Sequence, residues 1–106
     1  VEAAFSNRAV GWAPEPDRQR MFGYGNYDLA MSTLETALAG KDYIAAGRFT
    51  AADLFVGSMV GFMLQFKLLE AKPVFTDYAA RVTDRDAFRR ASDLDNQLMA
   101  EVQAPA

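Results

Sequence analysis

The sequence contains neither cysteine nor histidine among its 106 residues. The absence of cysteine excludes a disulfide framework, and the absence of both residues removes the usual ligands of zinc, haem and iron–sulfur clusters. Catalytic triads and dyads that use histidine as the general base are excluded as well. Catalysis would have to rely on carboxylates, lysine, tyrosine or serine, and we expect no catalytic residue, metal or cofactor in this chain.

An excess of one charge sign and a long hydrophobic run are also missing. The 11 basic side chains stand against 14 acidic ones, which gives a formal net charge of -3 without a basic segment. Nucleic-acid binding needs a basic face. The longest strongly apolar run, residues 54–64, is too short to cross a bilayer, which takes about 20 residues. We therefore expect neither a nucleic-acid partner nor a membrane partner.

Residues that favour β-strands are few. The chain has seven valines and one isoleucine against nineteen alanines and nine leucines, a composition that favours helix. No Asn-Gly or Asp-Gly pair marks a hairpin. Because 51% of the residues are hydrophobic and the length suits one globular domain, the sequence predicts a single all-α domain over residues 1–106.

Proline and glycine set the bounds of about five predicted helices. Pro73 favours the start of the fourth helix, and Gly40 ends the second. Gly23 and Gly25 weaken the second helix by about 1 kcal/mol each relative to alanine, which predicts a kink or a close contact there. The predicted helices cover residues 1–12, residues 17–39, residues 51–70, a short segment from residue 73, and residues 84–101, with a loop over 41–50.

Apolar periodicity predicts how these helices pack. The third helix is apolar almost all round, so we expect it to be buried at the centre of the bundle. Its Gly57 and Gly61 predict a close crossing by a neighbouring helix. The fourth helix carries one apolar stripe at i, i+3, i+4 and i+7, and the fifth helix carries apolar residues along one side. The residues predicted to face inward are Phe75, Tyr78, Ala79 and Val82 in the fourth helix and Phe88, Ala91, Leu94 and Leu98 in the fifth.

The start of the third helix carries a capping box. Thr50 is the expected N-cap, and the Asp53 carboxylate can reach back to the Thr50 amide. Phe49 and Leu54 occupy the N′ and N4 positions of a hydrophobic staple. The loss of such a cap costs about 1–2 kcal/mol. We interpret these four residues as structural rather than catalytic.

Two segments carry a family resemblance. Residues 43–53, with the sequence YIAAGRFTAAD, resemble the loop and capped helix of the C-terminal domain of cytosolic glutathione transferases. Residues 78–91, which contain YAAR and RDAFRRA, resemble a later part of the same domain, and the helix order agrees over nearly the whole chain. There are two departures: the family usually has Gly-Asp where this chain has Ala46-Gly47, and often proline at the position of Asp86.

The resemblance implies the fold and the activity of a larger protein. It implies a helical bundle around a buried central helix, which pairs with a separate N-terminal thioredoxin-like domain. That missing domain would bind the co-substrate glutathione and activate its sulfur. The complete protein would be a cytoplasmic, homodimeric detoxification enzyme that conjugates glutathione to a hydrophobic electrophile. This chain alone would be inactive, and it would begin partway through the family's first C-terminal helix.

The resemblance also implies a hydrophobic substrate site on the first helix, which in that family faces the cleft above the thioredoxin-like domain. The residues at this tentative site are Phe5, Arg8 and Trp12. Four other aromatic residues could line a pocket, but core packing is the favoured interpretation for Tyr24, Tyr27, Phe62 and Phe66.

Two other interpretations stay open. Transferase-like helical domains also occur as non-catalytic interaction or assembly modules, and an unrelated five-helix bundle could match by chance. A thioredoxin-like pattern encoded upstream of Val1, with Ser, Tyr or Cys near its start, would favour the enzyme. A different upstream domain would favour the module.

An acidic cluster near the C-terminus is the remaining candidate for a cation site, formed by Asp84, Asp86, Asp93 and Asp95. It lacks the spaced loop of a calcium motif, and a solvated charged surface is favoured. We expect i, i+4 ion pairs between Asp86 and Arg90 and between Asp77 and Arg81. Thr83 and Asp86 indicate a second capping box.

Without the thioredoxin-like domain, apolar surface near the first helix should be uncovered, and exposed apolar patches favour association. The expected contributors are Phe5, Val10, Trp12 and Phe22. We therefore expect the chain to self-associate through a rearranged first helix that fills the groove beside the third helix of a neighbouring copy. In the alternative, the short first helix folds back and closes that groove within one chain.

Overall fold

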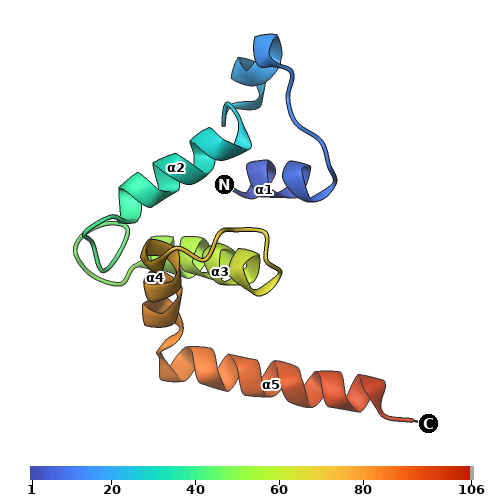
Figure 1. Ribbon diagram of the computed structural model, residues 1–106. Coiled ribbons are helices and arrows are strands. Elements are labelled where there is room, and N and C mark those ends of the chain that lie inside the picture. The colour runs from blue at the N-terminus through green and yellow to red at the C-terminus, as the bar shows by residue number, and fades with distance from the viewer. Residues whose placement is uncertain (106) are drawn as a thin grey trace.

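The computed structural model describes residues 1–105, and all the regular structure in that range is helical. Helix α1 covers Glu2–Ala9, the 3₁₀ helix η1 covers Pro16–Phe22, and α2 covers Tyr27–Leu38. Helices α3, α4 and α5 cover Ala51–Gln65, Pro73–Thr83 and Asp86–Gln103. The all-α prediction is confirmed for this part of the chain, as are the loop over 41–50 and the helix start at Pro73. Figure 1 shows α3 in the middle of the arrangement, with α1 and α2 on one side of it and α5 on the other.

The predicted helix over 17–39 is divided into two. The 3₁₀ helix η1 ends at Phe22, before Gly23, and both Gly23 and Gly25 have a positive φ, near +75°. Glycine adopts this backbone conformation without the Cβ clash that other residues meet. Asn26 then caps α2, because its side-chain Oδ1 accepts a hydrogen bond of 2.8 Å from the amide of Leu29. The two glycines therefore break the helix rather than kink it.

Helix α3 ends at Gln65, five residues before the predicted bound at residue 70. Lys67 takes a left-handed φ of 57°, the conformation that a Schellman C-cap requires. The amide of Leu68 donates to the Met63 carbonyl at 2.8 Å, and the Lys67 amide donates to the Leu64 carbonyl at 3.2 Å. These are the two hydrogen bonds of that motif. A lysine stands where glycine is usual, so the sequence carried no stop signal.

The core lies where α3 and α4 cross. All four residues predicted for the inner stripe of α4 are buried, so that prediction is confirmed. Gly57 of α3 lies against Val82 of α4: a Cβ added at Gly57 would be 2.5 Å from a Val82 methyl carbon. The predicted close crossing therefore occurs at Gly57. Gly61, by contrast, has open space at the Cβ position.

The prediction that α3 is buried on all sides is wrong. Its buried residues are Asp53, Gly57, Val60 and Met63, which face the core. The opposite face is open: Phe55 is 76% exposed, and Phe62 and Phe66 are about half exposed. The physical reason is that α1 is only eight residues long and covers one part of this face, while α5 approaches it through Phe88, which lines a cavity with Phe62.

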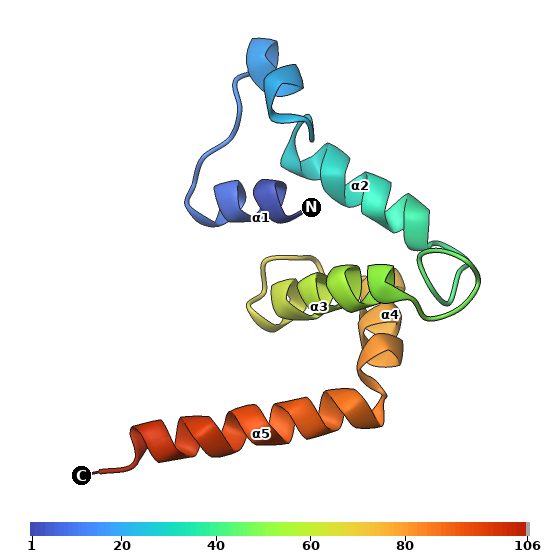
Figure 2. The same ribbon diagram turned by 180° about the vertical axis from the view of Figure 1, so that it is seen from behind.

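Helix α5 buries no residue. The predicted inward residues of this helix are all exposed, with Leu98 at 59%, so that prediction is wrong. Figures 1 and 2 show α5 leaving the end of α4 and running apart from the other helices to the C-terminal end. Periodicity gave the apolar face of this helix correctly, but within residues 1–105 this face stays open beyond Phe88, which lines a cavity with Phe62 of α3.

The local contacts between α4 and α5 also differ from expectation. The second capping box is wrong, because Thr83 is the last residue of α4 and its hydroxyl donates to the Ala79 carbonyl at 2.9 Å. Asp86 pairs with Arg89 at 2.7 Å instead of with Arg90. The partner of Arg81 is Asp42, at 3.7 Å, rather than Asp77.

Within residues 1–105, no helix has the length and hydropathy that a membrane crossing needs.

Candidate functional site

An apolar pocket lies where α1 meets α3. The cavity volume is about 530 Å³, which is within the size range of small-molecule sites. Phe5 of α1 is almost completely buried and meets Phe62 of α3 edge to face, with ring centroids 5.8 Å apart. The lining residues are Glu2, Phe5 and Ser6 from α1 and Leu54, Phe55, Ser58, Met59 and Phe62 from α3.

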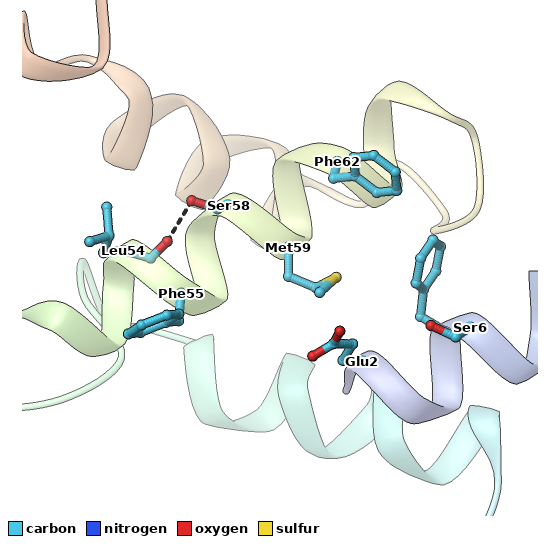
Figure 3. A pocket seen from close by; sticks show the side chains of 8 residues that line it. Glu2, Ser6, Leu54, Phe55, Ser58, Met59 and Phe62 are labelled. Atoms are coloured by element: carbon cyan, nitrogen blue, oxygen red, sulfur yellow. Dashed lines mark hydrogen bonds between the residues drawn. The ribbon is translucent and has the colours of Figure 1, made fainter. Parts of the chain in front are cut away.

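The side chains in this pocket offer aromatic faces and one charge. Figure 3 shows Phe55 and Phe62 toward opposite ends of the pocket and Met59 between them. The Ser58 hydroxyl donates to the Leu54 carbonyl of its own helix, so its proton is already engaged. Glu2 is the only charged residue among the lining residues. The pocket can therefore bind and orient an apolar molecule, but it has no pair of groups suited to acid–base or nucleophilic catalysis.

The structure brings only one of the three predicted substrate-site residues to this pocket. Phe5 lines it, whereas Arg8 and Trp12 do not. The Arg8 guanidinium lies over the Tyr27 ring, 4.6 Å from its centroid. Trp12 packs against Phe22 of η1, with centroids 5.1 Å apart. These contacts hold α1 and the following turn against η1 and α2.

Several pocket residues were missed or misplaced by the sequence analysis. Phe62 was expected in the core, but it is half exposed and forms a pocket wall. Phe55 and Met59 were counted with the buried central helix, and Glu2 was not considered. One signal was available: α3 has more apolar positions than its neighbours can cover, so some of them had to remain open.

Asp53 organises the structure next to the pocket. Its side chain is fully buried, and the Oδ2 atom accepts a 3.0 Å hydrogen bond from the Thr50 amide, as the predicted capping box requires. The Oδ1 atom accepts from the Ile44 amide at 2.9 Å and from the Tyr78 hydroxyl at 2.8 Å. One carboxylate thus joins the 41–50 loop, the start of α3 and the middle of α4.

These hydrogen bonds determine how Asp53 and Tyr78 ionise. Burial by itself raises the pKa of Asp53, but the hydrogen bonds from Ile44, Thr50 and Tyr78 outweigh burial and hold that pKa below its usual value. Burial raises the pKa of the Tyr78 hydroxyl, and the adjacent Asp53 carboxylate raises it further. Asp53 is therefore a carboxylate and Tyr78 a neutral hydroxyl at neutral pH, which suits a structural network.

The two residues of the predicted staple lie in different surroundings. The Phe49 ring meets the Tyr43 ring edge to face, with ring centroids 6.1 Å apart. The Arg85 guanidinium lies over the Phe49 ring, 4.3 Å from the centroid of that ring. Leu54 is about half exposed and belongs to the pocket wall. A direct contact between Phe49 and Leu54 stays a prediction.

Two of the acidic residues near the C-terminus form ion pairs with an arginine. Asp84 and Asp86 both bind Arg89, at 2.8 Å and 2.7 Å. Over residues 1–105, no three acidic side chains gather closely enough to hold a metal ion. The charged-surface interpretation therefore fits Asp84 and Asp86.

Comparison with known proteins gives no relative: no protein family model, no curated protein and no solved structure matches the chain.

Proposed function

We propose that the chain is the C-terminal helical domain of a glutathione transferase, in which the pocket between α1 and α3 forms the apolar wall for the electrophile. The observation that carries this proposal is the pocket itself, which joins Phe5 of the expected substrate helix to Phe55 and Phe62 of the capped helix α3. The buried Asp53 at the start of α3, within the segment that resembles the family, supports it further.

The contribution of this chain to the reaction is binding and orientation. An apolar pocket removes water from the electrophile and limits its orientations. Such positioning can remove a large part of the activation free energy of a bimolecular reaction. The glutathione sulfur would be activated by a thioredoxin-like domain, because no pocket residue here is paired with a base. The chain by itself should therefore leave the conjugation of glutathione with a chloronitroaromatic electrophile at the uncatalysed rate.

Binding of a neutral apolar fluorophore tests the proposal directly. The wild-type chain should bind the dye, and an apolar thioether of glutathione should displace it. Phe62→Ser should weaken dye binding about fivefold or more, since it removes a pocket aromatic ring. Leu98→Ser is the matched control, because Leu98 is similarly exposed but lies on α5 away from the pocket. Equal effects of the two substitutions would contradict the proposal, as would conjugation above the uncatalysed rate.

The second candidate function is a non-catalytic assembly module, and the open face of α5 favours it. Helix α5 presents Leu94, Leu98 and Val102 to solvent along an 18-residue helix. Beyond Asp86 and Arg89, which pair with each other, its first part carries Arg90, whereas its later part carries Asp93, Asp95 and Glu101. Two copies of this helix in antiparallel orientation would place opposite charges side by side, so the natural occupant of the face is α5 of a second chain.

Self-association can be measured by sedimentation equilibrium over the micromolar range. We expect concentration-dependent dimers, because apolar surface near the first helix is also exposed. Val10, Trp12 and Phe22 are exposed there, as the sequence predicted. The same prediction for Phe5 is wrong, because Phe5 is buried. Leu98→Ser should weaken dimers that form through α5, and Trp12→Ser should weaken dimers that form through the first helix. Asp77→Ser is the control for both. A monomer at every concentration would contradict association by either route.

A further inference from the structure

The pocket between α1 and α3 combines a carboxylate with aromatic walls. Glu2 contributes the only charge among its lining residues, and Phe5, Phe55 and Phe62 contribute three aromatic rings. Figure 3 shows the Glu2 carboxylate reaching from α1 toward Met59 of α3, between the positions of Phe55 and Phe62. A ligand that enters the pocket therefore meets negative charge in the middle and aromatic surface toward both ends.

We propose that this pocket selects lipophilic cations, that is, compounds with an aryl or alkyl body and an ammonium group. The ammonium would lie beside Glu2, and the apolar body would lie against Phe55, Met59 and Phe62. This inference rests on the proposed function, because it names the ligand class of the same pocket. It goes further by assigning a charge preference and by giving Glu2 a specificity-determining role.

The preference for cations follows from how the same pocket interacts with cationic, neutral and anionic ligands. The faces of aromatic rings carry negative potential and attract cations, and the Glu2 carboxylate adds a direct charge–charge attraction. A neutral apolar ligand would instead cover Glu2 without replacing the water that solvates it, which costs free energy. An anionic ligand would meet like charge, and the pocket lining offers no lysine or arginine to offset the repulsion.

The size of the preference follows from the exposure of Glu2, which is open to solvent. A solvent-exposed ion pair and one cation–π contact are each worth a modest amount. Together they should make the cation bind about five- to tenfold more tightly than its neutral isostere. Added salt should reduce that ratio, because the ion pair is screened by salt.

Three ligands with a common body measure this preference: phenylbutylammonium, phenylbutanol and phenylbutyrate. Their dissociation constants can be obtained by NMR titration of the full chain near neutral pH. We expect the ammonium to bind most tightly and the carboxylate most weakly. Glu2→Gln should reduce the preference for the ammonium to the part that the aromatic rings supply, and the alcohol should bind as tightly as it does to wild type or slightly more tightly. Glu101→Gln on α5 is the matched control and should keep the preference.

The outcomes separate this inference from the proposed function. If the three ligands bind wild type equally, the charge preference is wrong while the apolar pocket stands. If none of them binds, both the inference and the proposed ligand site are wrong. A preference that is undiminished in Glu2→Gln would overturn the role of Glu2. Because Glu2 is an exposed first-turn residue, its variant should fold, and the salt dependence of wild type gives a second readout that needs no substitution.

Discussion

Replacement of Gly57 by alanine should destabilise the protein by about 1–3 kcal/mol, the usual cost of overpacking a filled core. The added Cβ would lie 2.5–2.9 Å from three carbon atoms of Val82. Val82 is buried and β-branched, so it cannot rotate away without moving α4. The loss should exceed the gain of about 1 kcal/mol that alanine normally brings over glycine inside a helix. Urea denaturation followed by circular dichroism measures the result.

Gly61→Ala is the matched control, because Gly61 lies one turn further along the same helix with open space at its Cβ position. This substitution should stabilise the protein by about 0.5–1 kcal/mol through helix propensity alone. Combining Gly57→Ala with Val82→Ala should recover part of the loss, since the two positions are in contact. If both glycine variants stabilise the protein, the close crossing of α3 and α4 is wrong.

Asp53→Ala should cost about 3–5 kcal/mol, more than the 1–2 kcal/mol expected for a helix cap alone. The substitution leaves the Ile44 amide, the Thr50 amide and the Tyr78 hydroxyl without their acceptor. An unsatisfied buried donor costs more than the hydrogen bond itself contributes. Tyr78→Phe, which removes a single hydrogen bond to the same carboxylate, should cost about 1–2 kcal/mol. A loss of no more than the cap value for Asp53→Ala would show that the loop and α4 do not depend on this carboxylate.

The same carboxylate makes stability depend on pH in a defined direction. The pKa of Asp53 is lower in the folded chain than its ordinary value of 3.8, so the folded state binds the proton less readily than the unfolded state. The stabilisation is therefore complete above about pH 4 to 5 and is lost as the pH falls through the folded-state pKa. The difference in urea midpoint between wild type and Asp53→Ala should shrink over that acidic range. A difference that stays constant from neutral to acidic pH would contradict the carboxylate network.

Local signals in the sequence determined the parts of this fold that depend on a few neighbouring residues. The capping residues Thr50 and Asp53 define where α3 begins, and Pro73 defines where α4 begins. The inner stripe of α4 was identified in full, because periodicity alone decides which residues share a face of a helix. The break before α2 was signalled by Gly23 and Gly25, although its extent was underestimated.

Tertiary structure alone decided which apolar faces were covered. Helices α3 and α5 both have apolar positions that remain open, because periodicity defines a face but does not supply a neighbour to bury it. The end of α3 before the left-handed Lys67 also had no signal in the sequence, because no glycine marked it. The pocket depends on the approach of Glu2 and Phe5 to a helix some fifty residues away in sequence. Such contacts arise from the packing of whole helices. The types and spacing of the residues therefore determine the helices, whereas the way in which the helices pack against one another determines the site.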